Sequence, residues 1–93
     1  MSESRKKLRI HGRVQGVFFR AWSAETARAL GLAGWVRNRR DGSVEMLLAG
    51  AKDKVAAMIE RCRGGPPAAR VERIDVEETA EEVPAGFETR PTG

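Results

Sequence analysis

Residues 34–50, GWVRNRRDGSVEMLLAG, contain two strand patterns joined by a tight turn. In the second half, Val44, Met46 and Leu48 occupy alternate positions, which is the spacing of a β-strand with one buried face. The first half, GWVRN, also indicates a strand. The Asp-Gly pair between the two is a strong hairpin signal, because these residues tolerate the backbone that tight turns need. The sequence therefore predicts a β-hairpin here.

On both sides of this hairpin the apolar spacing lengthens from two residues to three or four. Residues 20–30 are rich in alanine, and residues 52–63 carry an apolar stripe. Both patterns are typical of helices with one buried face. The stripe residues are Ala24, Ala27 and Leu30 in the first helix and Val55, Met58, Ile59 and Cys62 in the second. The GGPP turn at 64–67 ends the second helix, since proline cannot continue it.

The outer parts of the chain indicate further strands. KLRIHG near the N-terminus alternates through Leu8 and Ile10, and RVERIDVEE at 70–78 places Ile74 and Val76 on one face. A short last strand is predicted around Phe87. The chain ends, about residues 1–5 and 91–93, are expected to fray, as chain ends commonly do.

The predicted order is strand, helix, strand, strand, helix, strand. This order is typical of an α+β fold, the ferredoxin-like split β-α-β sandwich, with an antiparallel sheet of four to five strands and two helices on one face. The length of 93 residues predicts a single domain, 1–93. Because this fold carries many functions, function has to be inferred from particular residues.

Composition narrows the class of protein. Apolar residues make up 41% and charged residues 32% of the chain, a balance typical of soluble globular domains. No apolar stretch has membrane-spanning length or follows the N-terminus as a signal segment. The single cysteine, Cys62, excludes an intrachain disulfide, and a cytoplasmic location is expected. The net charge is +4 and 13 of 17 basic residues are arginine, which suits either nucleic acid or a small anion.

The segment HGRVQGVFFR, residues 11–20, joins the first strand to the first helix. Gly12 and Gly16 allow main-chain N–H groups to face one point without obstruction. The helix N-terminus adds the positive end of its dipole, and Arg20 can reach the same point. These features predict a cradle for a phosphate-sized anion. The spacing differs from that of a nucleotide P-loop.

Asn38 is a second candidate, at the end of a strand just before the hairpin turn. We expect the second strand to run antiparallel to the first. Its end would then lie at the opposite edge of the sheet from the cradle, and the residues alone do not bring Asn38 to the anion.

Two segments carry a resemblance to a known family. GRVQGVFFR, from Gly12 to Arg20, matches the first signature of the acylphosphatases residue for residue. GWVRNRRDGSV, from Gly34 to Val44, matches the second signature, and the likeness continues through GPPAARVERIDVE. The chain therefore resembles the acylphosphatase family over nearly its whole length.

The resemblance implies a function and a site. Acylphosphatases hydrolyse the carboxyl-phosphate bond of acyl phosphates to a carboxylate and inorganic phosphate. The family likeness implies in-line attack of water without a metal, a cofactor or a phosphoenzyme. Arg20 and Asn38 would be catalytic, with Asn38 positioning the water. The phosphate would be held by the Arg20 side chain and by the main-chain amides of Gln15, Gly16, Val17, Phe18 and Phe19.

The chemistry is consistent with these residues. A carboxylate leaves readily, so no strong general acid is needed. Charge stabilisation and orientation of the water remain, and Arg20 would supply the only full charge. A phosphate oxygen of the substrate is the hypothesised proton acceptor. The expected partners are small acyl phosphates, with neither nucleic acid nor membrane, and the expected state is a monomer.

Two alternatives belong to other classes of protein. An RNA-binding domain of the same topology would use the positive charge, but the predicted strands offer only Trp35 for stacking on bases. A non-catalytic anion-binding regulator would keep the cradle and lack turnover. His11 is expected at the surface and Cys62 in the core.

Two groups of residues keep two interpretations each. Phe18 and Phe19 line the mouth of the site or pack in the core. The basic trio Arg37, Arg39 and Arg40 attracts anionic substrates or is simply solvated.

Overall fold

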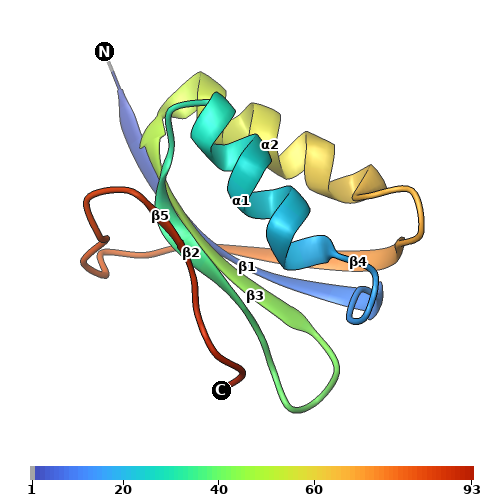
Figure 1. The fold of residues 1–93 in the computed structure, drawn as a ribbon. Coiled ribbons are helices and arrows are strands. Elements are labelled where there is room, and N and C mark those ends of the chain that lie inside the picture. Colours follow the sequence, from blue (N-terminus) through green and yellow to red (C-terminus); the bar gives the residue numbers. More distant parts are fainter. Residues whose placement is uncertain (1) are drawn as a thin grey trace.

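The computed structural model describes residues 2–93 and shows a five-stranded sheet with two helices packed on one face (Figure 1). The ferredoxin-like α+β prediction is confirmed, and every predicted element is present. In chain order the elements are β1 (Glu3–Arg13), α1 (Phe19–Ala29), β2 (Ala33–Asn38), β3 (Val44–Ala51), α2 (Lys52–Gly64), β4 (Arg70–Glu78) and β5 (Phe87–Thr89).

The relative directions of β1 and β2 correct one expectation. The strand order is β4-β1-β3-β2-β5, and both β1 and β2 pair antiparallel with β3 between them. Two strands antiparallel to the same neighbour run parallel to each other, so the expectation that β2 opposes β1 is wrong. The physical reason is that α1 crosses over the sheet and leaves a gap that β3 fills. The residues after β1 and the end of β2 therefore share one edge of the sheet.

The last strand corrects a second expectation. β5 pairs parallel with β2, from Gly34 opposite Phe87 to Val36 opposite Thr89, so the sheet is mixed rather than antiparallel throughout. β4 ends beside the start of β1, with Glu78 opposite Lys6. Residues 79–86 cross from there to the other edge of the sheet (Figure 1). The chain thus enters β5 at the end where β2 begins and runs in the same direction.

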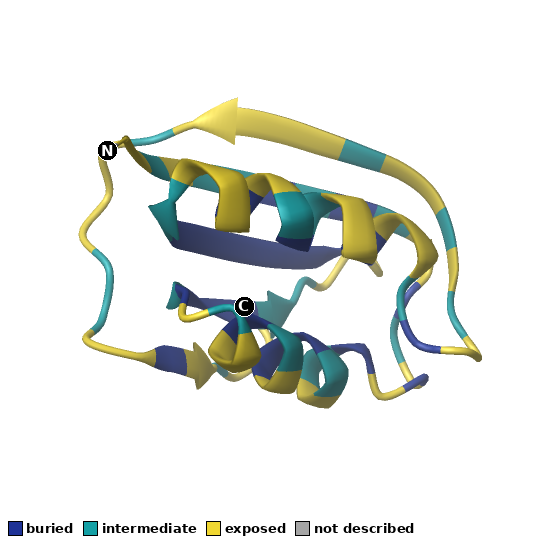
Figure 2. Cartoon of the chain, turned by 90° about the horizontal axis from the view of Figure 1, so that it is seen from above, coloured by how far each residue is buried: buried dark blue, intermediate teal, exposed yellow. Residues whose placement is uncertain are grey.

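The hydrophobic core lies between the helices and the sheet. Figure 2 shows the helices exposed on their outer sides and β4 exposed along most of its length. The core includes Leu8, Ile10, Val36, Val44, Met46 and Leu48 from the sheet and Ala24, Ala27, Val55, Met58 and Cys62 from the helices. Burial raises the pKa of the Cys62 thiol to about 12, in agreement with its predicted core position. Val76, predicted on the inner face of its strand, is 42% exposed, because it lies on the edge strand.

Both chain ends contact the sheet. β1 already begins at Glu3, which lies opposite Ala51, and the Gly93 N–H donates to the Asn38 carbonyl oxygen at 3.1 Å. Fraying of residues 1–5 and 91–93 stays a prediction, and residue 1 lies outside the described part. Among residues 2–93, neither helix combines the length and the hydrophobicity that a bilayer crossing requires.

Candidate active site

The loop between β1 and α1 is anchored by apolar side chains. Val14, Val17 and Phe19 are buried in the core, and the Phe19 ring contacts the edge of the Trp22 ring at a centroid distance of 5.4 Å. Phe18, in contrast, is exposed. The structure thus assigns Phe19 to the core and Phe18 to the surface, and the anchors hold the loop backbone in place.

The loop backbone has the geometry of an anion cradle. Gly16 and Phe18 both adopt left-handed backbone conformations, with φ of 73° and 62°. Turns containing left-handed residues allow neighbouring N–H groups to face one point. Within residues 2–93, no N–H group from Gln15 to Phe19 donates a hydrogen bond to another main-chain group. The N-terminus of α1 follows directly, so its unpaired N–H groups extend the same surface.

Gly12 does not belong to this cradle, which corrects its predicted role. It lies within β1 at a β-bulge between His11 and Gly12. A Cβ atom at this position would collide with the Arg70 carbonyl oxygen and lie 2.9 Å from the Glu72 nitrogen. The sequence therefore uses glycine here to let β4 approach β1, whereas Gly16 serves the left-handed turn.

Arg20 and Asn38 line the same depression, of about 410 Å³. It is also lined by Val14, Gly16, Phe18, Phe19, Ala21 and Thr89. Within residues 2–93, neither the Arg20 guanidinium nor the Asn38 carboxamide has a side-chain hydrogen bond or ion pair. Both groups are therefore available to a ligand, and the parallel run of β1 and β2 explains how they meet.

Gln15 connects the two halves of the depression. Its Nε2 donates to the carbonyl oxygens of Arg39 at 2.7 Å and Ser43 at 2.9 Å. These acceptors lie in the hairpin directly after Asn38. The sequence predicted only a main-chain N–H role for Gln15, and this side-chain role was not predicted. The amino-acid composition gave a signal for this role, since the chain contains one glutamine and one asparagine and both lie in the segments that line the depression. Thr89 was also missed, and no local pattern indicates it.

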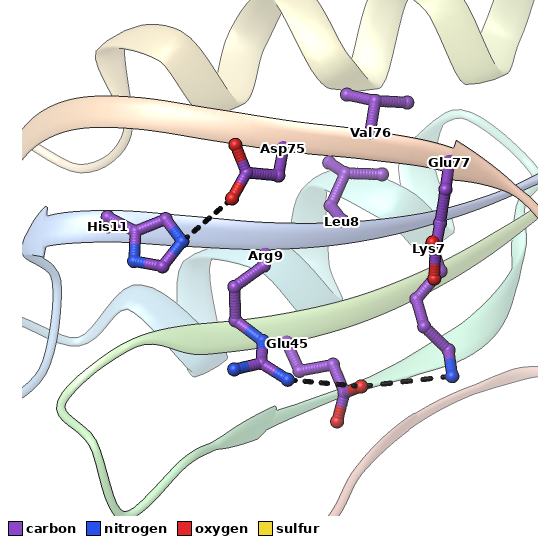
Figure 3. Close-up of a pocket in the computed structure, with 8 residues that line it drawn as sticks. All are labelled: Lys7, Leu8, Arg9, His11, Glu45, Asp75, Val76 and Glu77. Atoms are coloured by element: carbon purple, nitrogen blue, oxygen red, sulfur yellow. Dashed lines mark hydrogen bonds and ion pairs between the residues drawn. The ribbon is translucent and has the colours of Figure 1, made fainter.

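The face of the sheet opposite the helices carries a second group of charges, which we call the Glu45 cluster. Glu45 is 5% exposed and accepts from Arg37 at 2.9 Å and Arg39 at 3.3 Å. The Nζ of Lys7 and a guanidinium nitrogen of Arg9 lie 3.8 Å from its other carboxylate oxygen (Figure 3). Two of the three arginines of the basic trio are therefore bound to a carboxylate instead of being simply solvated.

The cluster also bears on Asn38. Because side chains alternate along a strand, Arg37 and Arg39 share the face opposite that of Asn38. Their ion pairs with Glu45 hold the end of β2, and with it Asn38, against β3.

The remaining candidates lie outside the depression. His11 is half-buried, and its Nε2 lies 3.1 Å from the Asp75 carboxylate. No group of three or more His, Cys, Asp or Glu side chains arranged to hold a metal occurs among residues 2–93. The predicted independence of a metal stays a prediction.

Comparisons with known proteins agree on one family. The family model described as Acylphosphatase matches residues 6–89. A relative from Rhizorhabdus wittichii named acylphosphatase is 56% identical over 87 residues, which is 94% of this chain and 88% of that protein.

Solved structures give the same result. An acylphosphatase from Coxiella burnetii superposes with a TM-score of 0.90 at 36% identity, over 95% of this chain and 93% of that one. An acylphosphatase from Bacillus subtilis superposes with a TM-score of 0.85 at 34% identity, over 92% and 97% of the two chains.

Proposed function

The chain belongs to the acylphosphatase family and is an enzyme of that class, and we propose that the depression lined by Arg20 and Asn38 is its catalytic centre. One observation carries this proposal. The Arg20 guanidinium and the Asn38 carboxamide, both without a side-chain partner among the described residues, line one depression beside a loop of unpaired N–H groups. A substrate phosphate would give the guanidinium and the N–H groups a partner, and the attacking water would give one to the carboxamide.

The loop and Arg20 would hold the phosphoryl group. Main-chain N–H groups of residues 15–19 would donate to its equatorial oxygens, and the α1 N-terminus would add its dipole. The guanidinium is a rigid fork of donors suited to two oxygens at once. Because the loop is anchored through Val14, Val17 and Phe19, these donors would need little rearrangement as charge develops in the transition state.

Asn38 would orient the attacking water. A carboxamide can donate to and accept from water but is a poor base. The water oxygen would form a bond to phosphorus as the bond from phosphorus to the acyl oxygen breaks in line with it. The leaving carboxylate needs no proton. Since no Asp, Glu or His side chain among residues 2–93 lines the depression, the proton of the water would pass to a phosphate oxygen.

This sequence of events needs neither a metal nor a covalent intermediate. The products are the carboxylate and inorganic phosphate. The proposed enzyme is a monomer that acts in the cytoplasm. Size-exclusion chromatography with light scattering tests the monomeric state.

The RNA-binding alternative is weakened by the Trp35 ring. This side chain is 4% exposed, and the guanidinium groups of Arg37 and Arg90 lie 5.0 and 5.1 Å from its ring centroid. A base could not stack on it without displacing them. Against a binding-only regulator, Asn38 at the depression offers a group suited to positioning a water.

The test is hydrolysis of benzoyl phosphate with a chelator present, by the wild type, Arg20→Ala and Asn38→Ala. Arg63→Ala removes an exposed arginine on α2, paired with Glu60, and serves as the matched control. We expect turnover to survive the chelator and the control, and to fall at least about a hundredfold in both site variants. Turnover that persists in both site variants would place the reaction elsewhere.

A second measurement tests the mechanism. Hydrolysis in ¹⁸O-labelled water should place the label in phosphate and none in benzoate, since the attack is at phosphorus. Acid quenching with ³²P-labelled substrate should leave no label on the protein. Label in benzoate, or a phosphorylated protein, would contradict direct attack of water on phosphorus.

A further inference from the structure

Phe18 is an exception among the apolar residues of the loop. Val14, Val17 and Phe19 are buried, whereas Phe18 is 83% exposed. Among residues 2–93 the other exposed large apolar side chain is Val76, at 42%. Leaving an aromatic ring in water forgoes the hydrophobic stabilisation that burial would bring.

The backbone of Phe18 makes its side chain still less expected. It is the one non-glycine residue with a positive φ among residues 2–93. Left-handed backbone disfavours side chains with a Cβ, and glycine or asparagine usually occupies such positions. Folding alone therefore does not favour phenylalanine at this position, because its Cβ disfavours the left-handed backbone and its ring stays in water. Contact of the ring with a ligand would offset the cost of this exposure.

Phe18 lies where such a contact can form. It lines the depression together with Arg20 and Asn38. In an acyl phosphate the acyl carbon is separated from phosphorus by one oxygen, so the acyl group begins beside the bound phosphate. Among the described residues, Arg20 is the one charged side chain of the lining, and it is assigned to the phosphate. The described lining therefore offers the acyl group an aromatic ring and no ionic partner.

We propose that the Phe18 side chain contacts the acyl group and makes the enzyme select acyl phosphates with apolar acyl groups larger than acetyl. This inference rests on the proposed site, because the phosphate must be bound beside Arg20. The main-chain N–H of Phe18 would bind the phosphate of every substrate, whereas its ring would distinguish one acyl group from another.

The test is the ratio of kcat/KM for benzoyl phosphate to kcat/KM for acetyl phosphate. We expect this ratio to fall about fivefold in Phe18→Ala, the scale of one aromatic contact, and by less in Phe18→Leu. Phe18→Gly suits the left-handed backbone and should lower the ratio as Phe18→Ala does, which separates loss of the ring from a disturbed loop. Val76→Ala removes the other exposed apolar side chain and should leave the ratio unchanged.

A ratio within twofold of wild type in both Phe18→Ala and Phe18→Gly would overturn the inference, including the case where both substrates lose activity equally. The two proposals fail in different ways. If the wild type hydrolyses neither substrate, the proposed function is wrong. If the wild type hydrolyses both and the ratio does not change in the Phe18 variants, only the proposed role of Phe18 is wrong.

Discussion

The depression and the Glu45 cluster both contain arginine side chains, but the environments of these cations differ. In the depression, Arg20 has no acidic partner among the described residues. In the cluster, four cations surround one buried carboxylate. A guanidinium without a partner can bind a substrate, whereas paired cations stabilise the sheet. The pairing of the cations therefore distinguishes these two regions, which the net charge does not.

Cavity size, like net charge, does not identify the candidate site. The cavity beside the Glu45 cluster, at about 500 Å³, is larger than the depression. Its charged side chains largely bond one another, as Lys7 and Arg9 do with Glu45 and His11 with Asp75 (Figure 3). A ligand would have to replace these contacts, so the smaller depression is the better candidate.

The strongest test of this contrast is Arg20→Ala. We expect kcat/KM for benzoyl phosphate to fall about a thousandfold, because the phosphate loses the only fully charged group proposed to bind it. The free energy of unfolding should change by less than about 0.5 kcal/mol, since Arg20 has no partner to lose. Arg20→Lys should recover only part of the activity, because an ammonium lacks the planar fork. A strong loss of stability in urea denaturation would contradict the contrast.

Glu45→Gln is the opposite case. Removing the charge that the four cations share should lower the free energy of unfolding by about 3 kcal/mol, measured by urea denaturation. Activity of the folded variant should fall less than about tenfold, through a looser end of β2. Glu60→Gln breaks the exposed pair with Arg63 and should change stability by less than about 0.5 kcal/mol. An equal effect of both variants would show that burial of Glu45 contributes nothing.

Gln15→Glu sharpens the contrast at the bond between the loop and the hairpin. A carboxylate of similar size cannot donate to the carbonyls of Arg39 and Ser43. We expect kcat to fall about tenfold and stability to fall by about 1 kcal/mol. Inhibition by inorganic phosphate should weaken less than kcat falls, because the bond positions Asn38 relative to the loop. Equal losses in kcat and phosphate affinity would indicate a disturbed loop instead.

The smallest expected effect concerns pH and the same charged face. The pKa of Asp41 is lowered by hydrogen bonds from Ser43, that of Asp75 by its hydrogen bond from Arg73, and that of Glu81 by Lys7. A lowered pKa stabilises the folded state above the ordinary values of 3.8 and 4.5. This stability is lost as pH falls through the lower pKa values of the folded state.

Urea denaturation between pH 6 and pH 2.5 measures this loss. Asp41→Asn should make the unfolding midpoint slightly less sensitive to acid, and the change should be small because the carboxylate is exposed. A steeper acid dependence in Asp41→Asn would contradict the assignment.

The sequence by itself determined the elements and predicted the cradle. Periodicity of two or of three to four residues is a local property, so the hairpin at 34–50, both helices and the strand at 70–78 could be predicted. Gly16 and Arg20 could be assigned to one junction between loop and helix for the same reason, since they lie within five residues of each other. The two signature segments then indicated the family.

Only the tertiary structure decided how these pieces meet. The position of Asn38 depends on β3 lying between β1 and β2, and the parallel direction of β5 depends on the crossing at 79–86. The approach of Lys7 and Arg9 to Glu45 and the exposure of Phe18 likewise depend on distant neighbours. Strand order and side-chain partners join residues far apart in the chain, and local periodicity carries no information about such pairs.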